Sequence, residues 1–238
     1  MPVYAYAGRV TLAPLPLIRR VCAEFIGSAS VTTIVVGSGI AATNLTHDVG
    51  LQLLINALVT AFGLYALITV FGPLSGAHFN PLVSLADAAL GLRGLMDIGP
   101  YLLAQVAGCI AGSALANTMF DLPPVSFSTT ERVTAAHLLA EVVATAGLIF
   151  IIFTLARTGR GQFAAAAVAT YMGAAYFFTS STSVANPAIA VGRMFTDTFA
   201  GIAPTSALPF IGAQIVGAAI GFAAMKFFTP GSPARAAS

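Results

Sequence analysis

The chain has 238 residues, of which 58% are hydrophobic and only 8% are charged, and its formal net charge is +2 at pH 7. Soluble domains carry about 25% charged residues, so this composition excludes an ordinary soluble protein and indicates an integral membrane protein. A net charge this small gives no sign of a nucleic-acid partner. The length suits a single domain, residues 1–238, of about six transmembrane helices, because each helix needs roughly 20 apolar residues.

The N-terminal residues and the two cysteines suggest no special chemistry. Residues 1–18 lack the long apolar stretch of a signal peptide and are expected to form a short cytoplasmic tail. Cys22 and Cys109 lie inside apolar runs, without the spacing of metal ligands. We therefore expect both to be buried small side chains, and we expect no metal and no cofactor.

Long apolar runs recur along the chain and predict six transmembrane helices. The runs occupy approximately residues 20–42, 49–71, 98–119, 135–156, 163–180 and 207–228. Two further apolar stretches, 80–91 and 186–196, are too short to span a bilayer, and each begins with Asn-Pro. The sequence thus predicts an all-α membrane protein with six spans and two re-entrant half-helices.

Basic residues fall mainly on one side of the predicted membrane. Lys/Arg-rich connections stay in the cytoplasm, so both termini of this multi-pass protein are expected to be cytoplasmic, with the chain in the plasma or inner membrane. An even number of spans agrees with this orientation. The cytoplasmic group is Arg9, Arg19, Arg20, Arg93, Arg157, Arg160, Lys226 and Arg235, against Arg132 and Arg193 on the other side.

The two halves of the sequence, about 17–120 and 133–228, resemble each other. Three matches occur in the same order in each half, and each half contains three spans. The second half must therefore enter the membrane from the opposite face, which makes the repeats inverted. Inverted repeats are typical of proteins that move solutes through a site near the bilayer midplane. The matches are Ala23-Glu24 with Ala140-Glu141, Asn80-Pro81 with Asn186-Pro187, and Gln105 with Gln214.

Each Asn-Pro pair is expected to start a short helix, because Asn is a strong N-cap and Pro is well placed at the first helical position. A helix of about eleven residues rises only about 16 Å, so two half-helices entering from opposite faces would meet at the midplane. Their N-termini place partial positive charge there, and the amides of Asn80 and Asn186 offer N–H donors to a passing oxygen. This arrangement predicts passage of neutral solutes and exclusion of cations and protons.

Polar groups accompany both half-helices. The preceding segments, 72–79 and 179–185, are expected to be irregular backbone that lines a cavity and presents carbonyl acceptors. Glu24 and Glu141 are carboxylates inside apolar helices, where an acid is a candidate for function. They would either brace these loops through hydrogen bonds or relay protons. His78 would be either a pore-lining donor or a loop histidine without contact to solute.

This pattern resembles the major intrinsic protein family, which comprises the aquaporins and aquaglyceroporins. The family's first signature is similar to Ser75-Gly76-Ala77-His78-Phe79-Asn80-Pro81. The Ala-Glu-Phe opening of the first helix, both repeated glutamines and a second motif, Asn186-Pro187-Ala188, match as well, over roughly residues 17–228. The resemblance implies six helices with two half-helices, and usually a homotetramer with one pore per subunit.

Departures from the family pattern bear on selectivity. The first motif has Leu82 where the family usually has Ala, and Ile189 stands where the second motif usually continues with the Arg of the outer selectivity filter. Without that Arg, the side chains of the filter would be small and uncharged, and the opening between them would be wider. The resemblance is therefore to a bacterial subgroup with an atypical second motif. By the family's spacing, the other filter positions fall on Thr60, Ala174 and Ser183.

Arg193 is a candidate replacement for the missing arginine, because it lies four residues after Ile189 on the same helix face. One hypothesis is that it supplies the cationic donors of the filter from a more outward position. The alternative is an ion pair with Asp197 at the membrane surface. The counterpart of Arg193 in the first half is Asp87, which is expected to be a solvated charge at the cytoplasmic mouth.

These features predict a passive channel for water and small uncharged solutes such as glycerol-like polyols. Residues 177–183 and 197–201 resemble a bacterial subgroup linked to metalloid permeation, which implies uncharged arsenite as a further solute. The alternative is a secondary transporter, since inverted repeats and broken helices also occur in that class. An enzyme is not expected, because no nucleophile–base or metal-binding pattern surrounds the three histidines.

Overall fold

The structure is a computed structural model that describes residues 15–230. Within this range the chain forms eight α-helices and three short 3₁₀ segments, and it contains no β-strand. The prediction of an all-α membrane fold is confirmed. The expected N-terminal tail, up to residue 14, and Arg9 and Arg235 lie outside the described residues.

Five helices of the described range are long and apolar enough to cross a membrane. Each lies within a few residues of a predicted span, because the apolar runs are long and clearly bounded. These helices are α1 (Leu17–Leu45), α2 (Val49–Ser75), α4 (Ile98–Met119) with the 3₁₀ turn Leu95–Asp97 before it, α5 (Ala135–Arg157) and α8 (Pro204–Phe228).

The remaining long helix, α6 (Ala164–Phe178), is shorter than the predicted span at 163–180. Its 15 residues rise about 22 Å, less than the roughly 30 Å of a hydrocarbon core. The 3₁₀ turn Gly161–Phe163 precedes it. The helix stops because Thr179 takes an extended conformation (φ −111°, ψ 138°) and the chain turns into the second irregular loop.

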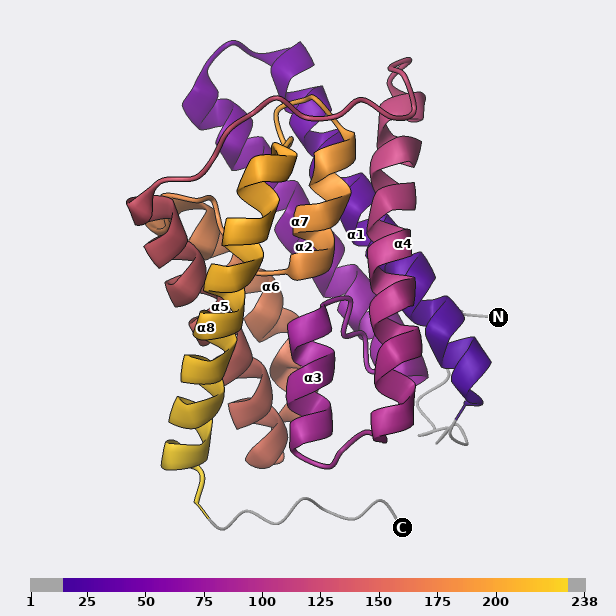
Figure 1. Cartoon of the computed structure of the whole chain (residues 1–238), viewed down its shortest axis with the longest axis vertical. Helices are drawn as coiled ribbons and strands as arrows, with labels where there is room; N and C mark the ends of the chain where they lie inside the picture. Colours follow the sequence, from indigo (N-terminus) through magenta and orange to yellow (C-terminus); the bar gives the residue numbers. More distant parts are fainter. Residues whose placement is uncertain (1–14, 231–238) are drawn as a thin grey trace, which may run out of the picture.

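Two short helices, α3 (Pro81–Ala89) and α7 (Pro187–Gly192), lie end to end in the middle of the bundle (Figure 1). Each begins with an asparagine cap: Asn80 Oδ1 accepts from the Leu82 N–H at 3.0 Å, and Asn186 Oδ1 accepts from the Ala188 N–H at 2.9 Å. Helix α7 ends earlier than expected from the stretch 186–196, because the chain tightens into a 3₁₀ turn at Arg193–Phe195.

Glycines bring two pairs of long helices into close contact. A Cβ atom at Gly108 of α4 would lie 2.4 Å from the Phe25 carbonyl oxygen of α1. A Cβ atom at Gly217 of α8 would likewise lie 2.4 Å from the Val142 carbonyl oxygen of α5. Gly112 and Gly221, one turn further on, have the same relation to α1 and α5. Only glycine allows backbones to approach this closely.

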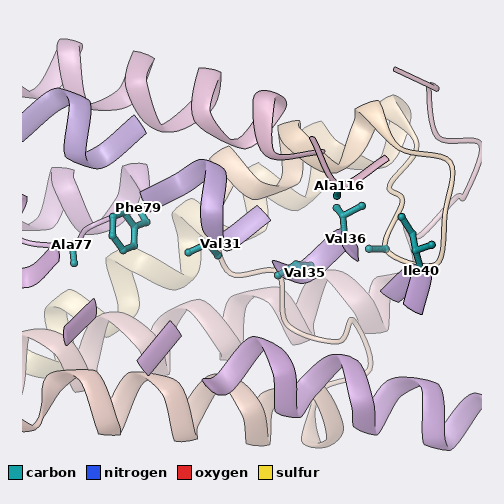
Figure 2. Close-up of a cluster of buried hydrophobic side chains, with 8 residues drawn as sticks. Val31, Val35, Val36, Ile40, Ala77, Phe79 and Ala116 are labelled. Atoms are coloured by element: carbon teal, nitrogen blue, oxygen red, sulfur yellow. The ribbon is translucent and has the colours of Figure 1, made fainter. Parts of the chain in front are cut away.

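A cluster of buried apolar side chains fixes the first irregular loop against α1. Val31, Val35, Val36 and Ile40 of α1 belong to it, together with Ala77 and Phe79 from the loop (Figure 2). The Phe79 ring fills the space above Gly27, where a Cβ atom would lie only 1.9 Å from the ring.

The expectation of two buried cysteines is half wrong. Cys109 is buried on α4, whereas Cys22 is exposed on α1. The buried side of α1 begins at Ala23 and Glu24 and returns at Gly27 and later positions at helical spacing. Cys22 lies beside this stripe and therefore faces outward.

Candidate solute pathway

Two irregular loops lead to the half-helices, and both contain residues in the left-handed region of backbone conformation. In the first loop these are Ala77 (φ 49°) and Phe79 (φ 48°), and in the second they include Ser183 (φ 54°) and Ala185 (φ 48°). Such a conformation costs a non-glycine residue of order 1 kcal/mol or more and persists only where the surroundings hold it. Both loops therefore need strong contacts to keep their shape.

Glu24 supplies these contacts to the first loop. The carboxylate is fully buried and accepts four hydrogen bonds. Oε1 accepts from the Ser75 hydroxyl at 2.6 Å and from the His78 backbone N–H at 3.0 Å. Oε2 accepts from the Phe79 backbone N–H at 2.7 Å and from the Gln105 amide at 2.8 Å.

Glu141 makes the same set of contacts to the second loop. Oε1 accepts from the Ser181 hydroxyl at 2.6 Å and from the Val184 N–H at 2.9 Å. Oε2 accepts from the Ala185 N–H at 2.9 Å and from the Gln214 amide at 2.7 Å. Neither glutamate lines the central cavity, and both point into the irregular loops.

The two asparagines are held by each other's loops. Asn80 Nδ2 donates to the Ala185 carbonyl oxygen at 2.8 Å, and Asn186 Nδ2 donates to the Phe79 carbonyl oxygen at 2.7 Å. A side-chain amide carries two N–H donors, so each asparagine keeps one donor that is not used in this pair of bonds. Both asparagines line the cavity, which lets these donors meet a passing oxygen atom.

A cavity of about 410 Å³ contacts both asparagines and extends from Arg93 at one end to Arg193 at the other. Pro81, Leu82, Pro187 and Ala188 form the starts of the half-helices and do not line it. The predicted residues that do line it are His78, Asn80, Asn186, Thr60, Ser183, Ile189 and Arg193.

One predicted filter position is wrong. Ala174 is exposed on α6 and does not line the cavity. Tyr176, two residues further, does line it, and its hydroxyl lies 3.2 Å from Thr60 Oγ1. A shift of two residues along a helix turns the side chain by about 200° around the helix axis. An alignment error of two residues therefore selects a residue on the lipid side of α6 instead of one on the pore side. A tyrosine alone was no decisive signal in the sequence, because α6 carries a second one, Tyr171, whose hydroxyl donates to the Ala144 carbonyl oxygen of α5 and which does not line the cavity.

Arg193 is buried, with a relative exposure of 5%, and lines the cavity near Ile189. Its Nε donates to the Ala200 carbonyl oxygen, while its two terminal nitrogens have no hydrogen-bond partner among residues 15–230. The alternative ion pair with Asp197 does not form in the described part of the chain. Asp197 instead accepts from the backbone N–H of Thr129 at 2.9 Å.

Leu82 does not narrow the pathway, because its side chain points into the core. It is buried in a cluster with Ile149, Phe153 and Met225. Its neighbour Val83 is the residue that lines the cavity. The larger side chain at this position is therefore accommodated by packing between helices.

Asp87 is not the solvated charge that the sequence suggested, because it is buried with a relative exposure of 9%. Its Oδ2 accepts from Arg93 Nε at 3.1 Å and lies 3.5 Å from His78 Nε2. All three residues line the cavity at the end opposite Arg193. In the sequence, Arg93 indicates only the orientation of the chain in the membrane, since nothing local to Asp87 or Arg93 shows that the two residues pair.

An all-helical membrane protein whose two half-helices meet at a pair of asparagines, inside a continuous cavity, belongs to the class of passive membrane channels. The chain is a member of the major intrinsic protein family, and the match to that family covers residues 11–184. The match stops two residues before Asn186, in front of the second motif with its unusual Ile189. Proteins of this family are channels and not enzymes.

Individual relatives agree with the family. The chain is 46% identical to aquaglyceroporin AqpS of Rhizobium meliloti (strain 1021), over 92% of this chain and 93% of that protein. It is 29% identical to a probable aquaporin NIP-type of Nicotiana alata, over 74% of this chain and 66% of that protein. The crystal structure of the aquaglyceroporin from Plasmodium falciparum shares the fold, with a TM-score of 0.69 and 18% identity over 91% of this chain and 97% of that one.

Proposed function

We propose that this protein is a passive channel for water and small uncharged solutes of the glycerol type. The observation that carries the proposal is the cavity of about 410 Å³, which passes between the two asparagines and has polar groups at both ends. The similarity to an aquaglyceroporin over nearly the whole chain supports this choice of solutes. Arsenite is uncharged and carries three hydroxyl groups at neutral pH, so its hydrogen-bonding outline is close to that of glycerol, and we propose it as a further solute.

Asn80 and Asn186 are proposed to form the central barrier to ions. Each offers an unused N–H donor at the meeting point of α3 and α7, where helix N-termini add partial positive charge. A neutral hydroxyl can replace its lost water contacts at these donors. A cation cannot replace its lost water contacts at N–H donors, and it meets a repulsive potential after losing its hydration.

The outer filter is proposed to consist of a half-buried apolar side chain, Ile189, opposite polar groups. Arg193 lies beside Ile189 on the cavity wall and is proposed to supply the donors that the family normally has at position 189. Without an arginine at that position the filter is wide enough for a polyol. The members of the filter are then Thr60, Tyr176, Ser183, Ile189 and Arg193.

Several properties of the assembled molecule are proposed on the same basis. Glu24 and Glu141 act as braces of the two loops, which their equivalent sets of hydrogen bonds support. The chain is one domain with inverted repeats at about 17–120 and 133–228. It assembles as a homotetramer in the plasma or inner membrane, with both termini in the cytoplasm.

A secondary transporter is not favoured. Such a protein needs groups that couple solute movement to an ion gradient. The carboxylates inside the described membrane-spanning helices are Glu24 and Glu141, and each is fully occupied by four hydrogen bonds. The carboxylate of the half-helix α3, Asp87, is paired with Arg93.

Stopped-flow light scattering on proteoliposomes, with water, glycerol and arsenite measured in parallel, tests the proposal. We expect protein-dependent flux of all three without any ion gradient. Empty liposomes provide the control. Flux of water alone would contradict the wide filter, and solute flux that requires a proton or sodium gradient would favour the transporter.

A further inference from the structure

We propose that Asp87 and Arg93 form a second selectivity site, at the end of the cavity opposite Arg193, which binds the hydroxyl groups of an uncharged polyhydroxy solute. This inference rests on the proposed channel function and adds a solute-binding site to it. Asp87 lies seven residues after Asn80, as Arg193 lies seven after Asn186. The two half-helix segments thus each carry one charged residue on the cavity wall, of opposite sign.

The geometry of the site is fixed by contacts outside the cavity. Arg93 Nη2 donates to the Ser75 carbonyl oxygen at 2.9 Å, and its guanidinium carbon lies 4.2 Å from the centre of the Tyr101 ring. Tyr101 is fully buried, and its hydroxyl donates to the same carbonyl at 2.9 Å. Arg93 in turn holds Asp87 at 3.1 Å. A binding group that is held in place loses little freedom when a solute arrives.

Each member of the pair keeps a hydrogen-bonding atom that the protein does not use. Asp87 Oδ1 has no partner among residues 15–230, although Oδ2 is bound by Arg93. Arg93 Nη1 has no hydrogen bond in the same range, and the Asp97 Oδ2 atom lies 4.0 Å from it. The side chains of Asp87 and Arg93 retain 13% and 10% exposure, and both line the cavity.

The pair therefore offers one strong acceptor and one strong donor with little net charge. A solute hydroxyl can donate to the carboxylate while a second hydroxyl accepts from the guanidinium. A bare cation is attracted by Asp87 and repelled by Arg93, and an anion is attracted by Arg93 and repelled by Asp87. Neither ion therefore gains net electrostatic stabilisation at the pair. The neighbouring charges are already engaged: Asp97 accepts from Arg20 at 2.6 Å, and Glu24 is occupied by the loop. His78 adds a ring whose Nδ1 contacts Ser84 Oγ at 3.0 Å.

The purely structural alternative is that the pair only pins the connection between α3 and α4. Asp87→Asn separates the two roles, because an asparagine keeps the shape and still accepts from Arg93, but it removes the carboxylate from the cavity. If Asp87 binds solute, the ratio of glycerol to water permeability falls by at least about threefold, as expected when one charge-assisted hydrogen bond is weakened. If the role is structural, both permeabilities fall together with the melting temperature, or neither changes.

Asp97→Asn is the matched control. Asp97 is a nearby carboxylate that accepts from Arg20 at 2.6 Å and does not line the cavity. It lies 4.0 Å from Arg93 Nη1, which is too far for a hydrogen bond. We expect it to leave the glycerol-to-water ratio unchanged. Both variants and the parent protein are to be measured in the same stopped-flow assay, with the amount of folded protein fixed by size-exclusion chromatography.

The outcomes distinguish this inference from the function on which it rests. Absence of glycerol flux through the parent protein would overturn the proposed function itself. Glycerol flux through the parent, with an unchanged ratio in Asp87→Asn or an equal change in Asp97→Asn, would overturn only the second selectivity site.

Discussion

At the scale of single residues, the pathway depends on side chains whose hydrogen-bonding capacity is divided between the protein and the solute. Asn80 and Asn186 each give one amide N–H to the opposite loop and keep the other. Arg193 gives Nε to a carbonyl and keeps its terminal nitrogens. The protein thereby fixes the position of each donor without consuming all of its capacity.

Arg193→Ala should lower glycerol permeability roughly tenfold relative to water permeability, because one hydrogen bond to a charged donor contributes about 1.5–3 kcal/mol. Water makes fewer contacts in the widened filter and is less affected. The ratio is measured by stopped-flow on proteoliposomes. Arg193→Lys keeps the charge and should give an intermediate ratio, and an unchanged ratio in the alanine variant would exclude a filter role for this arginine.

Glu24 accepts from four donors, and a glutamine at this position would turn an N–H group towards at least one of them. Glu24→Gln should therefore destabilise the protein, since a buried donor without a partner costs about 1–3 kcal/mol. We expect a lower melting temperature in detergent and a joint loss of water and glycerol flux. Glu141→Gln should behave in the same way, because its contacts are equivalent.

A proton-relay role for these glutamates gives a different result. In that case the glutamine variants would fold and conduct water normally, and only a pH-sensitive dye trapped in the liposomes would report a change.

At the scale of the helices, the sequence predicts where each helix begins and ends better than it predicts which face of the helix lines the cavity. The bounds of α2 and α4 follow from apolar runs that begin and end clearly, and the starts of α3 and α7 follow from Asn-Pro. The pore side of α6 could not be predicted, because it depends on how that helix is turned against α2 and the loop. The family's spacing therefore pointed to Ala174, whereas Tyr176 lines the cavity.

Contacts that depend on several helices could not be predicted from the sequence either. The burial of Asp87 depends on Arg93, and that contact is fixed by Ser75 and Tyr101 on two other helices. The close approach of α7 to α4 is similarly a result of packing, since a Cβ atom at Gly192 would lie 2.7 Å from the Cys109 carbonyl oxygen. Such features arise only when all the helices are in place.

Gly217→Ala tests the close contact between α8 and α5. The added methyl group would meet the Val142 carbonyl oxygen at 2.4 Å, so the helices must separate. Overpacking of this kind costs about 1–3 kcal/mol, which should lower the melting temperature and the yield of folded protein. Gly212→Ala is the matched control on the same helix: nothing lies within 4 Å of its Cβ, and alanine favours helix formation. Equal melting temperatures for the two variants would contradict this account.

At the scale of the whole molecule, the positions of the helix ends and the exposed apolar side chains indicate how the channel lies in a bilayer. The start of α1 and the end of α8 lie at the same end of the bundle, and the segment that connects α4 to α5 crosses the opposite end (Figure 1). Leu58, Phe62 and Tyr65 of α2 are exposed, with fractions of 46%, 69% and 51%. In a membrane these side chains face lipid or a neighbouring subunit.

The proposed orientation predicts which loops an impermeant thiol reagent can reach. In a Cys22→Ser, Cys109→Ser background, Val125→Cys introduces an exposed thiol between α4 and α5, and Gly161→Cys introduces one between α5 and α6. In sealed right-side-out vesicles, the reagent should modify the thiol at position 125 at once and the thiol at position 161 only after permeabilisation. The reverse pattern would place the termini outside.

The crosswise bonds between the asparagines and the opposite loops have a consequence for biosynthesis. The acceptor for Asn80 is the carbonyl of Ala185, 105 residues later in the chain, and the acceptor for Asn186 is the carbonyl of Phe79. A partly synthesised chain therefore contains Asn80 long before its partner exists, and the first half cannot form this contact alone. The meeting point of the two half-helices is completed last, so a membrane does not hold a conducting pore until both halves have been inserted and joined.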